Sequence, residues 1–178
     1  MPDTCLRPWL PDDAAALQAA FIADVDLAPQ FGGAELSAVE DARRFITQEL
    51  RSSDDRRNWA IIRDGGVVGN VGMSAIDRRH ATAWISYWLA GDARGQGLAT
   101  RAVMTVVEWA FTHGLFRLEL GHRVNNPASC AVATRAGFLP EGVERQKLAY
   151  GEERFDVELH ARLATDPEPT GGRLPFVR

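Results

Sequence analysis

The residues from Arg94 to Thr100 have the composition of a loop that binds an anion. The loop follows an apolar run at 84–90 that is typical of a buried strand, and a helical pattern begins near Gly97. Gly95 and Gly97 let a ligand approach the main chain closely, and the N–H groups at a helix start favour negative charge. The stretch therefore predicts a phosphate-binding loop. It is not a dinucleotide fingerprint, because Gly-x-Gly-x-x-Gly is incomplete, and it is not a P-loop, because no Gly-Lys-Ser/Thr follows.

A second polar group stands at Asn126 and Ser129. Asn126-Pro127 has the residue types of a helix cap and of the first helical position, and Ser129 falls in the following turn. Both side chains can satisfy the N–H groups of a helix start without any ligand. From the residues alone, a capping role is therefore sufficient.

Cysteine and histidine are the remaining candidates for chemistry. Cys5 and Cys130 form no metal-binding spacing, and two lone cysteines fit a reducing compartment. We expect Cys130 to be a small buried helical residue and not a reactive thiol. The histidines also lack ligand spacing, so the sequence predicts no metal site: they are His80, His113, His122 and His160.

The composition is that of a globular protein. The chain has 178 residues, of which 46% are hydrophobic and 25% charged, and its formal net charge is −4 at pH 7. The negative charge argues against general nucleic-acid binding, and neither a membrane-spanning apolar run nor a signal-peptide pattern is present. We therefore expect a cytoplasmic protein with no nucleic-acid or membrane partner. One domain is expected over residues 1–165, followed by a flexible tail, rich in Pro and Gly, over 166–178.

Hydrophobic periodicity predicts the elements that position the candidate residues. Asp64-Gly65-Gly66 between two apolar runs indicates a hairpin, and His113-Gly114 and Gly137 are helix stops. The expected strands are 4–9, 58–63, 67–76, 84–90, 117–124, 143–149 and 154–163, and the expected helices are 11–21, 37–51, 97–113 and 126–137. The segment 24–36 is predicted to be a loop.

Two blocks of the chain resemble a known family. Arg94-x-x-Gly97-x-Ala99 is similar to the Gln/Arg-x-x-Gly-x-Gly/Ala signature of the GNAT N-acetyltransferase superfamily. Arg-Val-Asn-Asn-Pro-Ala-Ser over 123–129, followed by Gly137-Phe138, resembles a block of its ribosomal-protein acetyltransferase (RimJ/RimL-type) branch. The order of predicted elements is also that of this family. The resemblance implies an α/β (α+β) fold, with a mixed, mostly antiparallel twisted sheet of about seven strands flanked by about four helices.

The resemblance also implies acetyl-CoA as co-substrate. The glycine loop would hold its pyrophosphate, and the strand ending at Leu89 would splay from strand 117–124 to free backbone groups for the pantetheine arm. Ser129 is the candidate catalytic residue, and hydrogen-bond stabilisation of the leaving thiolate is its expected role. The candidate cofactor-binding residues are Tyr87, Trp88, Leu89, Arg94, Gly95, Gln96, Gly97, Leu98, Ala99, Thr100, Asn126 and Ser129.

The sequence does not identify a general base. Ala133 stands where many family members have a Tyr acid, and Leu148 and Trp84 stand where an acidic residue is often found. The nearby candidates for the base are Glu119, His122, Glu144 and Asp156. We expect each of them to be a surface or core-supporting residue, and we therefore favour deprotonation of the amine through water and backbone carbonyls.

The acceptor predicted by the resemblance is a primary amine, with a protein N-terminal α-amine as the leading class. Acetylation of a small amine (a polyamine, an antibiotic or an amino acid) and a catalytically silent acyl-CoA-binding module are the alternatives. The oligomeric state is not readable, and a homodimer is compatible with the sequence.

Overall fold

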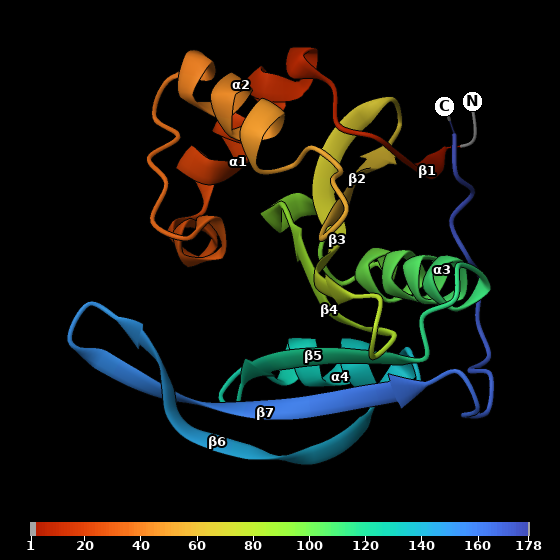
Figure 1. The fold of residues 1–178 in the computed structure, drawn as a ribbon. Helices are drawn as coiled ribbons and strands as arrows, with labels where there is room; N and C mark the ends of the chain where they lie inside the picture. The colour runs from red at the N-terminus through yellow and green to blue at the C-terminus, as the bar shows by residue number, and fades with distance from the viewer. Residues whose placement is uncertain (1–2, 178) are drawn as a thin grey trace.

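A twisted sheet of seven strands runs through the computed structural model, which describes residues 3–177 apart from the side chains of residues 25 and 26 (Figure 1). The spatial order is β1-β2-β3-β4-β5-β7-β6, and every neighbouring pair is antiparallel except β4 and β5, which are parallel. The strands are β1 (Thr4–Arg7), β2 (Arg57–Arg63), β3 (Gly66–Asp77), β4 (Thr82–Leu89), β5 (Arg117–Arg123), β6 (Leu139–Tyr150) and β7 (Glu153–Leu163).

Helices cover both faces of this sheet. On one face α1 (Ala14–Ala23), α2 (Val39–Gln48) and the 3-10 turns η1 (Pro11–Asp13) and η2 (Val25–Phe31) surround one apolar core. On the other face α3 (Leu98–Thr112) and α4 (Pro127–Arg135) pack over the second core. A short 3-10 turn, η3 (Gly91–Ala93), connects β4 to the loop before α3. No helix among residues 3–177 is both long enough and apolar enough to span a membrane.

The predicted fold class and order of elements are confirmed, several element ends shift by two or three residues, and two segments differ by more. Residues 25–31, predicted as loop, form the 3-10 turn η2. β6 begins at Leu139 and not at 143, because Leu139 already pairs with Ala161 of β7. Pro140 and Gly142 are unfavourable in most strands, so the sequence does not indicate that β6 starts here, but an edge strand such as β6 tolerates both residues.

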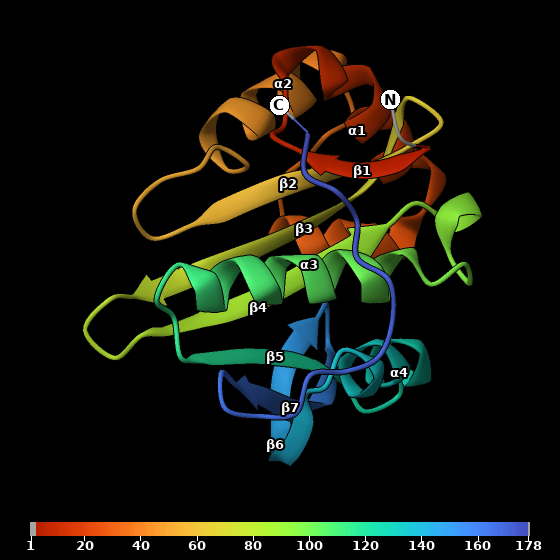
Figure 2. The ribbon, with the colours of Figure 1, turned by 90° about the vertical axis from the view of Figure 1, so that its right-hand side faces the viewer.

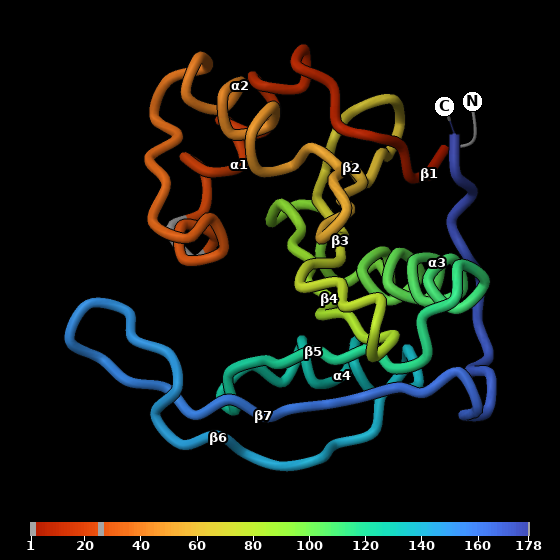
Figure 3. The backbone as a smooth tube through the Cα atoms, in the orientation of Figure 1, coloured from red at the N-terminus to blue at the C-terminus, as the bar shows by residue number. Residues whose placement is uncertain are grey.

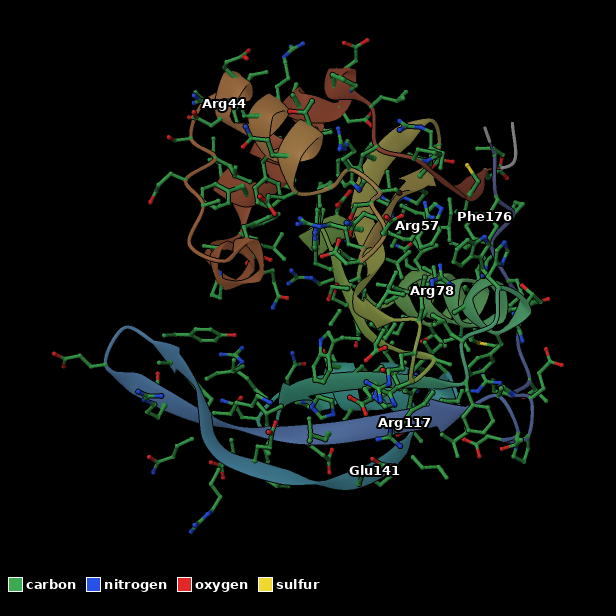
Figure 4. All side chains as sticks on the ribbon, in the orientation of Figure 1. Arg44, Arg57, Arg78, Arg117, Glu141 and Phe176 are labelled. Carbon is green, nitrogen blue, oxygen red and sulfur yellow. The ribbon has the colours of Figure 1, made fainter. Side chains whose placement is uncertain are left out.

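An ion pair holds the edge strand near its start. The Arg117 guanidinium on β5 donates from Nη1 and Nη2 to the two carboxylate oxygens of Glu141, at 3.0 and 2.5 Å. The two side chains lie together at the lower part of the sheet (Figure 4). The Arg117 guanidinium keeps the pKa of Glu141 below its usual value, so the pair is intact at neutral pH.

The C-terminal segment is packed, which differs from the expected flexible tail. The Leu6 N–H donates to Pro175 O at 2.9 Å, and the Val177 N–H donates to Leu6 O at 2.8 Å. Leu174 is 1% exposed, and its N–H donates to Thr105 Oγ1 at 2.8 Å. The segment therefore runs over α3 to β1, where Phe176 is labelled (Figures 2 and 4). The Pro and Gly residues of the segment impose an irregular backbone, but the apolar side chain of Leu174 is buried all the same. Residue 178 lies outside the described residues, and the domain limit at 165 stays a prediction.

This packing gives a first testable expectation. Leu174→Ala removes a buried side chain that bridges α3 and the C-terminal segment, so we expect the free energy of unfolding to fall by about 2–5 kcal/mol in chemical denaturation. Leu139→Ala is the matched control, because Leu139 is 61% exposed and its truncation should change stability by less than about 0.5 kcal/mol. Equal effects of the two substitutions would show that the segment is loose.

Candidate active site

β4 and β5 are paired over only part of their length. Parallel pairing runs from Thr82 opposite Arg117 to Trp84 opposite Glu119, whereas β4 continues to Leu89. Beyond Trp84 the two strands diverge, as the resemblance implies and as the backbone trace shows (Figure 3). Main-chain N–H and C=O groups on the facing edges then need partners other than the opposite strand. A ligand or water is the natural partner in this gap.

The glycine loop ends at the start of α3. Gly95 and Gly97 have φ values of +74° and +73°, in the left-handed region that glycine adopts without strain. Gly97 is the N-cap of α3, and no side chain caps the helix. The N–H groups of the first turn, at Leu98, Ala99 and Thr100, are therefore available to a ligand at the positive end of the helix dipole. This geometry is that of an anion-binding site.

Two predicted cofactor residues use their side chains to hold the loop. Arg94 Nε donates to Leu89 O at 3.0 Å, and its guanidinium pairs with Asp24. The Gln96 side-chain oxygen accepts a hydrogen bond from Arg63 at 3.2 Å. Both side chains are thus engaged within the protein. If the loop binds phosphate as predicted, Arg94 and Gln96 contribute through the main chain.

Trp88 and Leu89 lie at the divergent end of β4. The Trp88 ring packs on Phe31 and Trp9, with ring centroids 5.5 and 6.2 Å away, in the core under α1 and α2. The Leu89 side chain belongs to the opposite core, under α3. Their predicted role in cofactor binding is therefore restricted to main-chain groups.

Tyr87 connects the gap to α4. Its hydroxyl donates to Ser129 O at 3.4 Å, and burial raises the pKa of the phenol, so it remains protonated at neutral pH. Asn126 Oδ1 accepts from the Ser129 N–H at 3.1 Å, which confirms Asn126 as the cap of α4. The fold thus brings Tyr87, Asn126 and Ser129 together at one end of the gap. The capping bond uses the main-chain N–H of Ser129, so the Ser129 hydroxyl is not needed for capping and can interact with a ligand.

A cavity of about 480 Å³ opens beside the start of α3. Gly97 and Thr100 line it together with Arg101, with Arg135 at the end of α4, and with residues 169–172. Guanidinium groups are well suited to phosphate, so the cavity extends the anion-binding site. Sequence reasoning missed both arginines, because 34 positions separate them and only the packing of α4 and the C-terminal segment beside α3 brings them together.

A smaller cavity lies on the opposite face of β4. It measures about 260 Å³ and is bounded by η2, α2, β2, β3 and the Ser86–Trp88 part of β4. Glu49 and Asp55 contribute carboxylates to its lining, and Arg56 contributes a cation. β4 therefore separates the anion-binding side of the molecule from a second space where another reactant can approach.

The candidate bases are all engaged by neighbouring groups. None of the four therefore stands out as the group that deprotonates an amine in the gap, in agreement with the sequence analysis. Glu119 accepts from Arg117 at 2.6 Å, Asp156 accepts from the Gln146 N–H at 2.8 Å, His122 lies 3.1 Å from His160, and Glu144 pairs with Lys147.

Comparison with known proteins agrees with this geometry. Residues 3–139 match the model of the acetyltransferase (GNAT) domain. A ribosomal-protein-serine acetyltransferase of Escherichia coli is 30% identical over 138 residues, which cover 76% of this chain and 75% of the relative. A probable N-acetyltransferase of Bacillus subtilis, YjcK, is 34% identical over 136 residues, covering 73% and 75%.

A solved structure shares the whole architecture. Mycobacterium smegmatis RimJ, in complex with a coenzyme A disulfide, superimposes with a TM-score of 0.81 at 28% identity and covers 92% of this chain and 88% of that protein. The diverging strands, the uncapped helix behind the glycine loop and the family match lead to one assignment. The chain belongs to the GNAT acetyltransferase family and is an N-acetyltransferase.

Proposed function

We propose that this protein transfers an acetyl group from acetyl-CoA to the N-terminal α-amine of a protein or peptide. The observation that carries the proposal is the gap between β4 and β5, which joins the uncapped start of α3 to the first turn of α4. The E. coli relative is named for acetylation of a ribosomal protein, and the RimJ structure contains coenzyme A. The first name supports a protein acceptor, and the second supports coenzyme A as the carrier of the acetyl group. A cytoplasmic location accords with such an acceptor, and the homodimer stays a prediction.

The residues present fit acetyl-CoA. The pyrophosphate would lie on the N–H groups from Gly95 to Thr100, with Arg101 and Arg135 beside it in the larger cavity. The pantetheine arm would follow the unpaired edge of β4 toward Asn126 and place the thioester in the gap. Such positioning is a large part of catalysis, because it makes attack on the thioester effectively unimolecular.

The chemistry is a direct attack in a ternary complex. The amine nitrogen, having lost its proton through water and backbone carbonyls, attacks the thioester carbonyl carbon. The C–S bond then breaks as the attacking nitrogen releases its surplus proton to the same water chain, and the amide and a thiolate form. We assign the Ser129 hydroxyl to a hydrogen bond with that thiolate, which takes up a proton before coenzyme A leaves. Because a serine hydroxyl is a weak acid, we do not assign it as the donor of the proton that the thiolate takes up.

The first experiment separates an enzyme from a silent acyl-CoA binder. The purified protein is incubated with acetyl-CoA and a panel of amines, and free thiol is measured as coenzyme A is released. We expect release that depends on both the protein and the amine. Tight binding of acetyl-CoA in calorimetry without amine-dependent release would establish the silent binding module.

Ser129→Ala tests the role of the hydroxyl. Because the capping bond uses the Ser129 N–H, the substitution should leave stability nearly unchanged and lower kcat by about tenfold or more, with little change in KM for acetyl-CoA. Asn126→Ala removes the cap itself and is expected to cost about 1 kcal/mol of stability. A normal kcat together with a lowered Tm in Ser129→Ala would retire the catalytic assignment.

A small amine is the second candidate acceptor. The cavity beside β4, at about 260 Å³, has the size of a small ligand, and a cationic amine would bind the carboxylates of Glu49 and Asp55 in place of Arg56, which now pairs with them at 2.7 and 3.8 Å. Spermidine and free amino acids therefore belong in the amine panel. Glu49→Gln should raise KM for spermidine if this cavity binds it, and should leave KM for a neutral peptide unchanged.

A further inference from the structure

Four side chains with metal-binding atoms converge behind the proposed active site. His122 projects from β5, Glu158 and His160 from β7, and Cys130 from the first turns of α4. His122 lies opposite Glu158 in the antiparallel register, and His160 lies opposite Leu120, two residues earlier on β5. The two histidines are 7% and 2% exposed. Apart from His122, which is one of the candidates for the general base, the predicted function assigns no role to these residues.

We propose that His122, Cys130, Glu158 and His160 form a structural zinc site. One ligand atom from each residue lies within 4.8 Å of the others. The two Nε2 atoms are 3.1 Å apart, and Glu158 Oε2 is 3.0 Å from His160 Nε2 and 3.3 Å from His122 Nε2. Cys130 Sγ is 3.7 Å from the same oxygen. Ligand atoms at the corners of a zinc tetrahedron are roughly 3.3–3.7 Å apart, so only small movements are needed.

The hydrogen bonds of the rings favour a cation at the centre of the four residues. His122 Nδ1 lies 3.0 Å from Arg123 O, a carbonyl that only accepts, so the proton belongs on Nδ1 and Nε2 presents a lone pair. A carbonyl partner of this kind is what orients histidines that bind metals. His160 Nδ1 is buried and has no hydrogen-bond partner among the described residues, so the tautomer of that ring follows whatever its Nε2 binds.

A dication satisfies the group better than protons do. A proton on His160 Nε2 serves the contact to His122 or the contact to Glu158, whereas the thiol and three other ligand atoms converge on one space. Zn²⁺ binds all four at once, and with one thiolate and one carboxylate the site is neutral, as a buried position requires. The mixed nitrogen, sulfur and oxygen donors suit zinc, and four protein ligands leave no open position. The site is therefore structural.

The site would fix the first turns of α4 against β5 and β7. Cys130 follows Ser129 directly, and Asn126 caps the same turn. Bound zinc should therefore stabilise the protein and hold Asn126 and Ser129 in place. This role adds stability to the proposed enzyme, but the metal itself takes no part in acetyl transfer.

Cobalt replaces zinc as a visible probe. Chelator-treated, reduced protein is titrated with Co²⁺ without oxygen, and we expect saturation at one equivalent, tetrahedral visible bands and a near-ultraviolet thiolate-to-cobalt band that Zn²⁺ abolishes. Cys130→Ser should lose the thiolate band, and Cys5→Ala should keep it, because Cys5 lies in the other core. Zn²⁺ should raise the Tm of wild-type protein.

The histidine ligands are tested in the same way. His160→Gln should weaken zinc binding by more than about 100-fold, since loss of even an outer partner costs about 10–100-fold, whereas exposed His80→Gln should not change it. Circular dichroism checks that each variant is folded. Failure of wild-type protein to bind Co²⁺ or Zn²⁺ at one equivalent, or a Cys130→Ser variant that keeps the thiolate band, would overturn the site. Neither result depends on acetyltransferase activity.

Discussion

Gly97→Trp is expected to abolish acetyl-CoA binding and leave a folded protein. Gly97 caps α3 with φ +73°, and a Cβ built there meets no atom within 4 Å, so a side chain extends into open space beside the helix start. That space is where the proposed phosphates lie. An indole filling it should raise the Kd by at least about 100-fold, or ~2.7 kcal/mol, in calorimetric titration.

A matched variant separates loss of the site from backbone strain. Any L-residue at a left-handed position costs about 1–2 kcal/mol. Gly65 in the β2–β3 turn has φ +82° and also meets no atom within 4 Å, so Gly65→Trp carries a similar strain away from the loop. The two variants should lose similar stability, and only Gly97→Trp should lose binding. An unchanged affinity in folded Gly97→Trp would remove the phosphates from this loop.

The parts of the fold that depend on neighbouring residues were predictable from the sequence. Asp64-Gly65-Gly66 predicts the β2–β3 hairpin because a two-residue turn needs positive φ, which Asp64 and Gly65 adopt. Asn126-Pro127 predicts the start of α4 because the cap and the fixed proline φ act within one turn. The glycine loop was predictable for the same reason, because the backbone freedom that an anion-binding loop requires comes from glycines that are close together in the sequence.

The parts that depend on tertiary contact were not predictable. The Pro- and Gly-rich composition of residues 166–178 does not show that Leu174 fills a space beside Thr105. The histidines lack ligand spacing in the sequence, yet the β5–β7 register places His122 and His160 3.1 Å apart. Arg101 and Arg135 likewise share a cavity only because α3 and α4 pack together. No local sequence pattern predicts these contacts, because each one depends on how elements that are distant in the sequence pack together.

The engaged base candidates lead to the second large prediction, which concerns the choice of acceptor. A lysine amine with a pKa near 10.4 is only about 0.04% neutral at pH 7, whereas an α-amine with a pKa of about 7.7–8.0 is roughly 10–15% neutral. The difference corresponds to ~3.5 kcal/mol of deprotonation that the protein need not supply for an α-amine. Because Glu119, Glu144 and Asp156 are held by other partners, a site without a dedicated carboxylate base is matched to α-amines.

Competition between two peptides tests this acceptor preference. One peptide has a free N-terminus and no lysine, and the other has the same sequence with a blocked N-terminus and one lysine. We expect kcat/KM to be at least about tenfold higher for the free N-terminus, because the greater nucleophilicity of lysine returns only part of the difference in neutral fraction. The rate with the α-amine should also rise between pH 7 and 8 and then level as that amine becomes neutral, whereas the rate with lysine should keep rising. Faster acetylation of the blocked peptide would assign the site to lysine side chains, and faster acetylation of spermidine than of either peptide would assign it to polyamines. Either result would mean that one of Glu119, Glu144 and Asp156 gives up its present partner and acts as the base.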